Sequence, residues 1–256
     1  MSLAQEILAL AERARRASEP MGELDTRSKN AWLLRVAERL EAARETILEA
    51  NARDMAQAAA RGVPDALAKR LALSGGKWRD MLQGLRDVAA LPDPIGRISE
   101  HSVRPNGLRV GRMSIPLGVI GIIYESRPNV TVDAAALCVK AGNAVILRGG
   151  SEAIHSNLAL GEELRAAARE TGVPEDAVAI VPTTDRAAID VLLKADAYID
   201  LIIPRGGPGL IRKVKDESTI PVICHDAGVC HVFLDASAEI GMAIAIVRES
   251  KIRQMP

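Results

Sequence analysis

The sequence predicts an α/β fold in which an open parallel sheet carries helices on both faces, with N-terminal helices and a projecting β-hairpin before it. Three observations predict this fold. Apolar residues recur at helical spacing through the first ninety residues, the period changes to two from Ile95 onward, and short apolar runs then alternate with helical segments. Only five of the 256 residues are aromatic, so we expect an aliphatic core.

The N-terminal part is expected to be helical because its apolar residues fall on one face. One helix that Gly62 ends is predicted from the stripe Leu33, Val36, Leu40, Ala43 and Ile47. A second helix, capped by Ser74 and ended by Pro92, is predicted from the face Trp78, Met81, Leu82, Leu85 and Val88. These helices carry no chemical motif, so we assign them a structural role.

The segment 95–115 predicts a β-hairpin. Ile98–Arg104 and Leu108–Ile115 both alternate, and Asn106-Gly107 lies between them. Asn-Gly tolerates the positive φ angles of a tight type I′ turn, which is the turn that we expect here. A hairpin placed between a helical and an α/β segment often serves assembly, so we expect it to contribute to oligomerisation.

The remainder predicts alternating strands and helices. Continuous apolar runs are typical of parallel strands that are covered on both faces. The predicted strands are Gly118–Tyr124, Ala144–Arg148, Val178–Val181, Ile199–Ile203 and Pro221–Cys224. The predicted helices between and after them are Thr131–Lys140, Ala153–Thr171, Arg186–Lys194 and Gly209–Glu217. A further strand, 231–235, and a helix, 237–248, are expected near the end of the chain.

The loop after the second strand has the residue types of a nucleotide site. Ligands of open parallel sheets bind at the carboxyl ends of the strands, where helices begin. Arg148 provides a cation, Gly149 and Gly150 allow close backbone approach, and Glu152 provides a carboxylate for ribose hydroxyls. The alternative is that the two glycines only make a turn and that Arg148 is solvated.

Two other loops end at the same predicted edge of the sheet. Pro204–Gly209 resembles the first loop in having adjacent glycines, Gly206 and Gly207, after a strand. Tyr124–Thr131 follows the first strand and contains charged and amide side chains. Neither the Gly-x-Gly-x-x-Gly fingerprint nor the Gly-x4-Gly-Lys-Ser/Thr loop occurs, so a dinucleotide would have to bind in a different manner.

The cysteines give no metal or catalytic motif. Cys224-His225 and Cys230-His231 have zinc-binding residue types, but Cys-x5-Cys does not match the spacing of structural zinc sites, so we expect no metal. Cys138 and Cys230 lie in apolar segments and are expected to be inert core residues. An odd number of cysteines, three, fits a reducing compartment, and we expect a cytoplasmic protein.

Composition excludes other classes of protein. Lys plus Arg and Asp plus Glu are balanced at 33 each, which argues against nucleic-acid and anionic-membrane partners. The longest apolar run, Ile115–Tyr124, is about half of a membrane span, so no membrane partner is expected.

Four segments together carry a resemblance to a known family: Ile115–Asp133, Lys140–Gly150, Tyr198–Gly207 and Cys230–Asp235. They resemble the γ-glutamyl phosphate reductase family of the aldehyde dehydrogenase superfamily. The resemblance covers nearly the whole chain and implies an aldehyde dehydrogenase-like fold and, in the intact family, a homo-oligomer. The implied reaction is the NADPH-dependent reduction of L-glutamyl 5-phosphate to glutamate 5-semialdehyde and phosphate in proline biosynthesis. A cysteine thiolate forms a thioester, which hydride transfer then reduces.

The resemblance also implies roles for individual residues. Arg148 stands where the superfamily keeps a lysine that contacts the adenosine ribose, and its guanidinium would favour a 2′-phosphate. Glu152 matches a ribose-binding glutamate, and Gly206 and Gly207 fall near the pyrophosphate. Gly149 and Gly150 complete the cofactor-binding set.

Three further positions follow from the same resemblance. Asn129 is implied as the donor to the oxyanion and Arg127 as a ligand of the substrate's phosphate or carboxylate. Cys224 takes the place of the superfamily's general-base glutamate, whose absence suits an enzyme that must not hydrolyse its thioester.

The sequence departs from the family after the last predicted helix. The family has Lys-Thr-Gln-Arg-Pro-Ser followed closely by the nucleophilic cysteine, whereas residues 250–256 read Ser-Lys-Ile-Arg-Gln-Met-Pro. We therefore expect a cofactor-binding domain, 1–225, and only the start of a catalytic domain, 226–256, with the nucleophilic cysteine absent and the chain inactive alone. A frameshift or premature stop near Lys251 would explain this.

Two other functions stay open from the sequence. The first is a non-catalytic module that binds NADP or joins intact subunits through the hairpin. The second is an enzyme of the same chemistry that acts on a different acyl phosphate or aldehyde.

Overall fold

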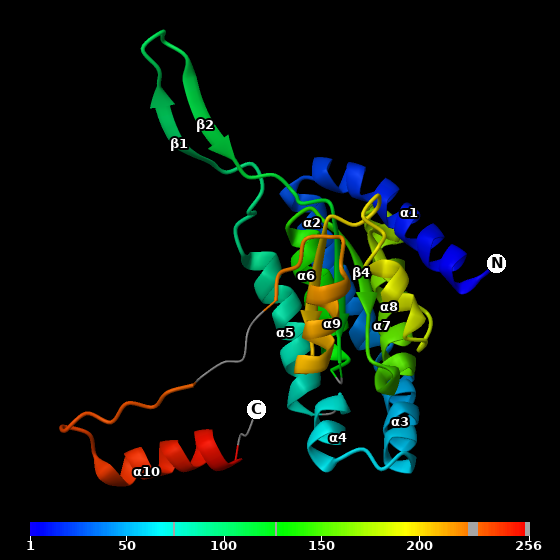
Figure 1. Ribbon diagram of the computed structural model, residues 1–256, viewed down its shortest axis with the longest axis vertical. Coiled ribbons are helices and arrows are strands. Elements are labelled where there is room, and N and C mark those ends of the chain that lie inside the picture. Colours follow the sequence, from blue (N-terminus) through cyan, green and yellow to red (C-terminus); the bar gives the residue numbers. More distant parts are fainter. Residues whose placement is uncertain (74, 126, 225–229, 254–256) are drawn as a thin grey trace. The chain divides into compact units, whose positions relative to one another are not determined.

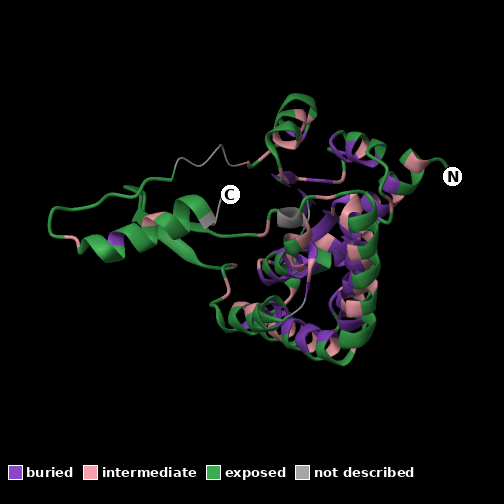
Figure 2. Cartoon of the chain, turned by 90° about the horizontal axis from the view of Figure 1, so that it is seen from below, coloured by how far each residue is buried: buried purple, intermediate pink, exposed green. Residues whose placement is uncertain are grey.

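The computed structural model describes residues 1–73, 75–125, 127–224 and 230–253. The chain divides into two compact units, Met1–Cys224 and His225–Pro256. The first unit contains the helices, the hairpin and the sheet, and in Figure 2 the buried residues are concentrated among its helices and strands.

Five helices precede the hairpin. They are α1 (Leu3–Glu23), α2 (Thr26–Ala42), α3 (Arg44–Ala60), α4 (Asp65–Leu71) and α5 (Gly76–Ala90). A capping box between Ser2 and Gln5 begins α1, and the Asp25 carboxylate accepts the Ser28 N–H at 2.7 Å at the start of α2. The predicted cap of α5, Ser74, lies outside the described residues, and Gly75 occupies the N-cap position.

The prediction of one helix through Leu33–Ile47 is wrong about its continuity. The helix breaks at Ala43, which ends α2 and begins α3 with φ −90° and ψ 11°. The stripe is nevertheless buried except at Ala43, which is half-buried, because a break at one residue lets both helices pack against α7 without changing which side chains face inward. Gly62, with φ +67°, follows α3 in the left-handed conformation, and the Val63 N–H donates to the Ala58 carbonyl.

The predicted hairpin is present, but its predicted turn type is wrong. Strand β1 (Ile98–Val103) pairs antiparallel with β2 (Arg109–Met113), and both are exposed along their length. The Arg104 N–H donates to the Leu108 carbonyl, so the loop has three residues, and Gly107 alone of them has a positive φ, +86°. Pro105 fixes its own φ near −65°, which favours a type I turn followed by a left-handed glycine.

The sheet of the first unit has four parallel strands. Strands β3 (Val119–Tyr124), β4 (Ala144–Arg148), β5 (Val178–Ile180) and β6 (Leu201–Arg205) lie in the order β5-β4-β3-β6 (Figure 1). The fifth predicted strand, 221–224, is wrong as a strand, because only Val222 forms a bridge, with Ile202. Because Pro221 has no N–H to donate, this segment forms only a few hydrogen bonds to β6, around Ile202.

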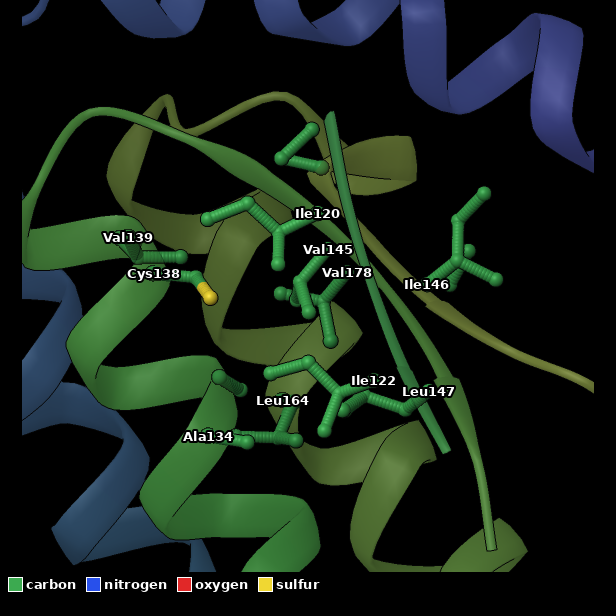
Figure 3. Close-up of a cluster of buried hydrophobic side chains, with 14 of the residues drawn as sticks. Ile120, Ile122, Ala134, Cys138, Val139, Val145, Ile146, Leu147, Leu164 and Val178 are labelled. Carbon is green, nitrogen blue, oxygen red and sulfur yellow. The ribbon is translucent and has the colours of Figure 1, made fainter. Parts of the chain in front are cut away.

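Helices cover both faces of this sheet. One face packs on α6 (Asn129–Lys140) and α7 (Ile154–Thr171), whereas α1 and α8 (Ala187–Leu192) lie on the other. Figure 3 shows Cys138 and Leu164 of these helices against Ile122 of β3 and Val145 of β4. Residues of β4 alternate between the two faces, as expected for a strand that is buried on both sides.

The second unit is short. Helix α10 (Ile240–Arg248) begins where the Glu239 carboxylate accepts the N–H groups of Gly241 and Met242. The predicted strand 231–235 is wrong, because these residues are exposed and pair with no strand in the described part of the chain. None of the helices within the described ranges is long and apolar enough to cross a membrane.

Candidate functional site

The parallel register brings the ends of three strands to one edge of the sheet. Arg148 at the end of β4 is opposite Ile123, and Arg205 at the end of β6 is opposite Tyr124. The loops that the sequence analysis selected therefore begin side by side. Two cavities open at these loops, and the predicted site residues divide between them.

The first cavity has a volume of about 620 Å³ and contains the predicted Arg148, Gly150 and Glu152. The residues around it come from five parts of the first unit. They include Arg61 after α3, Glu125 after β3, Arg186 and Ile189 at α8, and Leu210 on α9 (Pro208–Glu217). The cavity thus combines guanidinium groups, carboxylates and apolar walls.

Arg148 is buried, whereas Arg61 and Arg186 on the same cavity are exposed. Its side chain is buried, which excludes the alternative that it is solvated, and its Nη2 donates to the Thr184 carbonyl at 3.2 Å. Its Nε is buried without a hydrogen-bond partner in the described residues. Burial lowers the pKa of Arg148, and the positive charge of Arg186 lowers it further against the attraction of Glu152. An unsatisfied buried donor of this kind is suited to an anionic or polar ligand.

The two glycines after Arg148 both lie close to other side chains. A Cβ on Gly150 would lie 2.2 Å from Glu152 Oε1, because the glutamate folds over the glycine backbone. A Cβ on Gly149 would lie 2.0 Å from the amide nitrogen of Asn157, which is also buried without a partner among the described atoms. Gly149 therefore has no room for a side chain beside the buried Asn157, whereas at Gly150 the contact is with the end of the flexible Glu152 side chain.

The loop after β6 is bound by Glu125 of the loop after β3, a carboxylate to which the sequence analysis gave no role. Gly207 is the N-cap of α9, and its N–H donates to Glu125 Oε2 at 3.0 Å. A Cβ on Gly206 would lie 2.7 Å from the Glu125 carboxyl carbon. A helix N-terminus stabilises a nearby anion, and here Glu125 takes that place. The only signal for this role in the sequence is that Glu125 directly follows an apolar strand.

Helix α3 of the N-terminal part borders this cavity through Ala58 and positions one of its loops. Asp54 of α3 is buried and accepts the N–H groups of His155 and Ser156 at 3.1 and 2.7 Å and the Ser156 hydroxyl at 2.6 Å. This carboxylate caps the start of α7, directly after Glu152. The packing of α3 therefore fixes the position of the Arg148–Glu152 loop.

The second cavity, of about 340 Å³, contains the predicted Arg127 and Asn129. Asn129 is the first residue of α6, and its Nδ2 donates to Asp133 Oδ2 at 3.0 Å. The cavity also borders on Arg70, Lys77, Asp80, Met81 and Asp133, none of which the sequence analysis proposed as a site residue. The residues proposed for cofactor and substrate therefore lie in separate cavities.

The cysteines lie outside both cavities. Cys138 is buried in the core, and burial raises the pKa of its thiol to about 12, so it is inert at neutral pH. Cys224 is half-buried and Cys230 is exposed rather than in the core. His225 lies outside the described residues, and the described side chains contain no group of three or more His, Cys, Asp or Glu placed to hold a metal.

The structure is an α/β protein with two cavities at the loops that follow the carboxyl ends of an open parallel sheet. The chain belongs to the aldehyde dehydrogenase family, whose model matches residues 2–254.

Individual relatives of this chain share one enzyme name within this family. A γ-glutamyl phosphate reductase of Moorella thermoacetica is 52% identical over 254 residues, 99% of this chain and 61% of its own length. The crystal structure of γ-glutamyl phosphate reductase from Thermotoga maritima has a TM-score of 0.90 at 41% identity, over 97% of this chain and 60% of that one. The corresponding enzyme structure from Saccharomyces cerevisiae has a TM-score of 0.80 at 36% identity, over 99% and 64%. The chain thus spans about three fifths of these relatives.

Proposed function

We propose that this chain forms the NADPH-binding part, and one wall of the substrate site, of a γ-glutamyl phosphate reductase. The reaction would reduce L-glutamyl 5-phosphate to glutamate 5-semialdehyde and phosphate, a step of proline biosynthesis. The proposal is supported by relatives with that name at 52% identity and by a cavity with the features of a dinucleotide site. The observation that carries it is the buried Arg148, whose Nε has no partner among the described groups.

The residues present fit a phosphorylated dinucleotide. Arg61, Arg148 and Arg186 border the first cavity and suit a 2′-phosphate, because guanidinium groups bind phosphate in a planar, bidentate manner. Ile189 of α8 and Leu210 of α9 give apolar walls that suit an adenine ring. NADPH, when bound, would supply the hydride.

The remaining cofactor contacts follow from the loop geometry. Glu152 would accept from ribose hydroxyls, and Gly149 and Gly150 would let the backbone approach the ligand. The diphosphate would lie at Gly206 and Gly207, at the start of α9. Because the Gly207 N–H already donates to Glu125, a diphosphate oxygen at this amide would have to replace that carboxylate.

The substrate contacts belong to the second cavity. Arg127 would bind the substrate's phosphate or carboxylate, and the Asn129 amide would donate to the oxyanion of the tetrahedral intermediates. In the structure that amide donates to Asp133, which keeps it at the edge of the cavity.

The proposal has three further parts that rest on the sequence and the resemblance. Residues 1–225 would form the cofactor-binding domain and 226–256 the beginning of the catalytic domain. The hairpin 95–115 would contribute to a homo-oligomer. The protein would act in the cytoplasm.

The reaction is tested by joining this chain to the part of the Moorella thermoacetica relative that the match does not cover. The joined protein is expected to reduce NADP⁺ with glutamate 5-semialdehyde in a phosphate-dependent manner, whereas the chain alone is expected to show no turnover. A joined protein that folds and binds NADPH but remains inactive would contradict the proposed reaction. It would favour a module that only binds the dinucleotide.

A further inference from the structure

Two buried side-chain nitrogen atoms lack a hydrogen-bond partner among the residues that the structure describes, and both lie beside the loop after β4. They are Arg148 Nε and Asn157 Nδ2. The proposed function gives Arg148 a ligand, but it gives none to Asn157, a residue of α7 that is 1% exposed. Because a buried donor without an acceptor lowers stability, its presence points to a role other than stability.

The Asn157 amide is the end of a chain of three buried side chains. Thr131 of α6 donates its hydroxyl proton to Asn157 Oδ1 at 2.9 Å. The Thr131 oxygen also lies 2.6 Å from the Tyr124 hydroxyl, and since the Thr131 proton is already used, Tyr124 is the donor there. Burial raises the pKa of Tyr124, so this hydroxyl keeps its proton at neutral pH. The direction of both hydrogen bonds is thus fixed.

This chain determines which side of the Asn157 amide faces the loop. Because Oδ1 accepts from Thr131, Nδ2 is directed the other way, toward Gly149. A Cβ built on Gly149 would lie 2.0 Å from Nδ2 and 3.1 Å from Cγ of Asn157, and 3.2 Å from Cε2 of Tyr124. The amide and the tyrosine ring are therefore packed directly on the Gly149 backbone.

We propose that Asn157 is a positioning residue of the cofactor site, which holds the Gly149 backbone in a fixed place relative to β3 and α6. The inference rests on the proposed function, because the loop that Asn157 positions contains Glu152, which would contact NADPH. Asn157 Nδ2 is buried, so it acts on the ligand through Gly149 rather than by contact. Thr131 lies two residues after Asn129, so the same chain keeps the cofactor loop and the first turn of α6 in one arrangement.

The test removes the Thr131 hydroxyl while keeping the shape of the side chain. Thr131→Val leaves Asn157 Oδ1 and the Tyr124 hydroxyl without their partner, so the amide is no longer held in its orientation. NADPH binding to the chain, measured by fluorescence titration, is expected to weaken about tenfold. Thr131→Ser keeps the hydroxyl and is expected to bind NADPH within about twofold of the unsubstituted chain.

A variant that loses stability elsewhere is the control. Trp32→Phe removes a different buried hydrogen bond, from Trp32 Nε1 to the Leu164 carbonyl at 3.2 Å, and Trp32 borders neither of the two cavities. Thr131→Val and Trp32→Phe are both expected to lower the melting temperature by about 5 °C. In titrations well below these melting temperatures, Thr131→Val is expected to weaken NADPH binding and Trp32→Phe is expected to leave it unchanged.

A pair of substitutions tests the contact itself. Gly149→Ala places a Cβ against the Asn157 amide, and Asn157→Ala removes that amide. Each alone is expected to weaken NADPH binding about tenfold. The double variant is also expected to stay near tenfold rather than reach about a hundredfold, because both substitutions disturb one contact.

The outcomes separate this inference from the proposed function. NADPH affinity in Thr131→Val equal to that of the unsubstituted chain would overturn the inference, and so would fully additive losses in the double variant. Equal weakening in Trp32→Phe and Thr131→Val would show that the loss follows stability, which would also overturn it. In all these cases the unsubstituted chain still binds NADPH and the proposed cofactor site stands. Absence of NADPH binding in that chain would contradict the proposed function, and this inference with it.

Discussion

Replacement of Arg148 by Met is expected to weaken NADPH binding about 10- to 100-fold while leaving the melting temperature unchanged or higher. Charge-assisted hydrogen bonds to a phosphate contribute about 1.5–3 kcal/mol, which corresponds to that range. The guanidinium is buried with an unsatisfied Nε, and burial lowers its pKa. Its removal therefore relieves an unfavourable charge at the same time as it removes a phosphate ligand.

A comparison of NADPH with NADH tests whether Arg148 binds the 2′-phosphate. NADH lacks the 2′-phosphate, so its affinity is expected to fall by less than about threefold in the same variant. Fluorescence titration with both dinucleotides measures the two affinities, and Arg212→Met, on the exposed side of α9, is the control of equal charge. Equal losses for NADPH and NADH would remove the 2′-phosphate role from Arg148.

Replacement of Gly118 by Ala is expected to destabilise the first unit by about 3–5 kcal/mol. Gly118 has φ +116°, which costs other residues about 1–3 kcal/mol. An added Cβ would lie 2.1 Å from Asp200 Oδ2, the atom that accepts from Arg15 at 2.6 Å and from the Val119 N–H at 2.8 Å. The variant therefore combines backbone strain with the loss of charged hydrogen bonds at the start of β3.

The melting temperature measures this effect, which should be a decrease of about 10 °C. Gly76→Ala is the matched control, because nothing lies within 4 Å of its added Cβ and an alanine favours the first turn of α5. A Gly118→Ala protein that melts within about 2 °C of the unsubstituted chain would show that Asp200 does not constrain this position.

Much of the sheet could be predicted from the sequence because parallel strands that are buried on both faces leave continuous apolar runs. Residues 144–148 form a strand with the predicted bounds, and the helices between the strands begin and end within a few residues of the predicted positions. The errors arose where a local feature outweighed the pattern. The backbone angle of Ala43 interrupts a regular stripe, and Pro105 selects a turn that Asn-Gly alone does not predict.

The candidate sites could be predicted only in part. Arg148, Gly150 and Glu152 do lie on one cavity, and Arg127 and Asn129 lie on another, because strand ends are adjacent in a parallel sheet. Lys77 and Arg61 could not be predicted to border these cavities, since their places depend on how α3–α5 pack on residues far away in sequence. Glu125 directly follows a predicted strand. Its hydrogen bond from the Gly207 N–H could not be predicted, because that bond depends on the pairing of β3 with β6.

The central claim is that the carboxyl edge of this sheet is an NADPH site, and a direct titration of the chain with NADPH tests it. The account predicts saturable binding of one dinucleotide per chain, tighter for NADPH than for NADH. A folded chain that binds neither dinucleotide, or binds both with equal affinity, would contradict it.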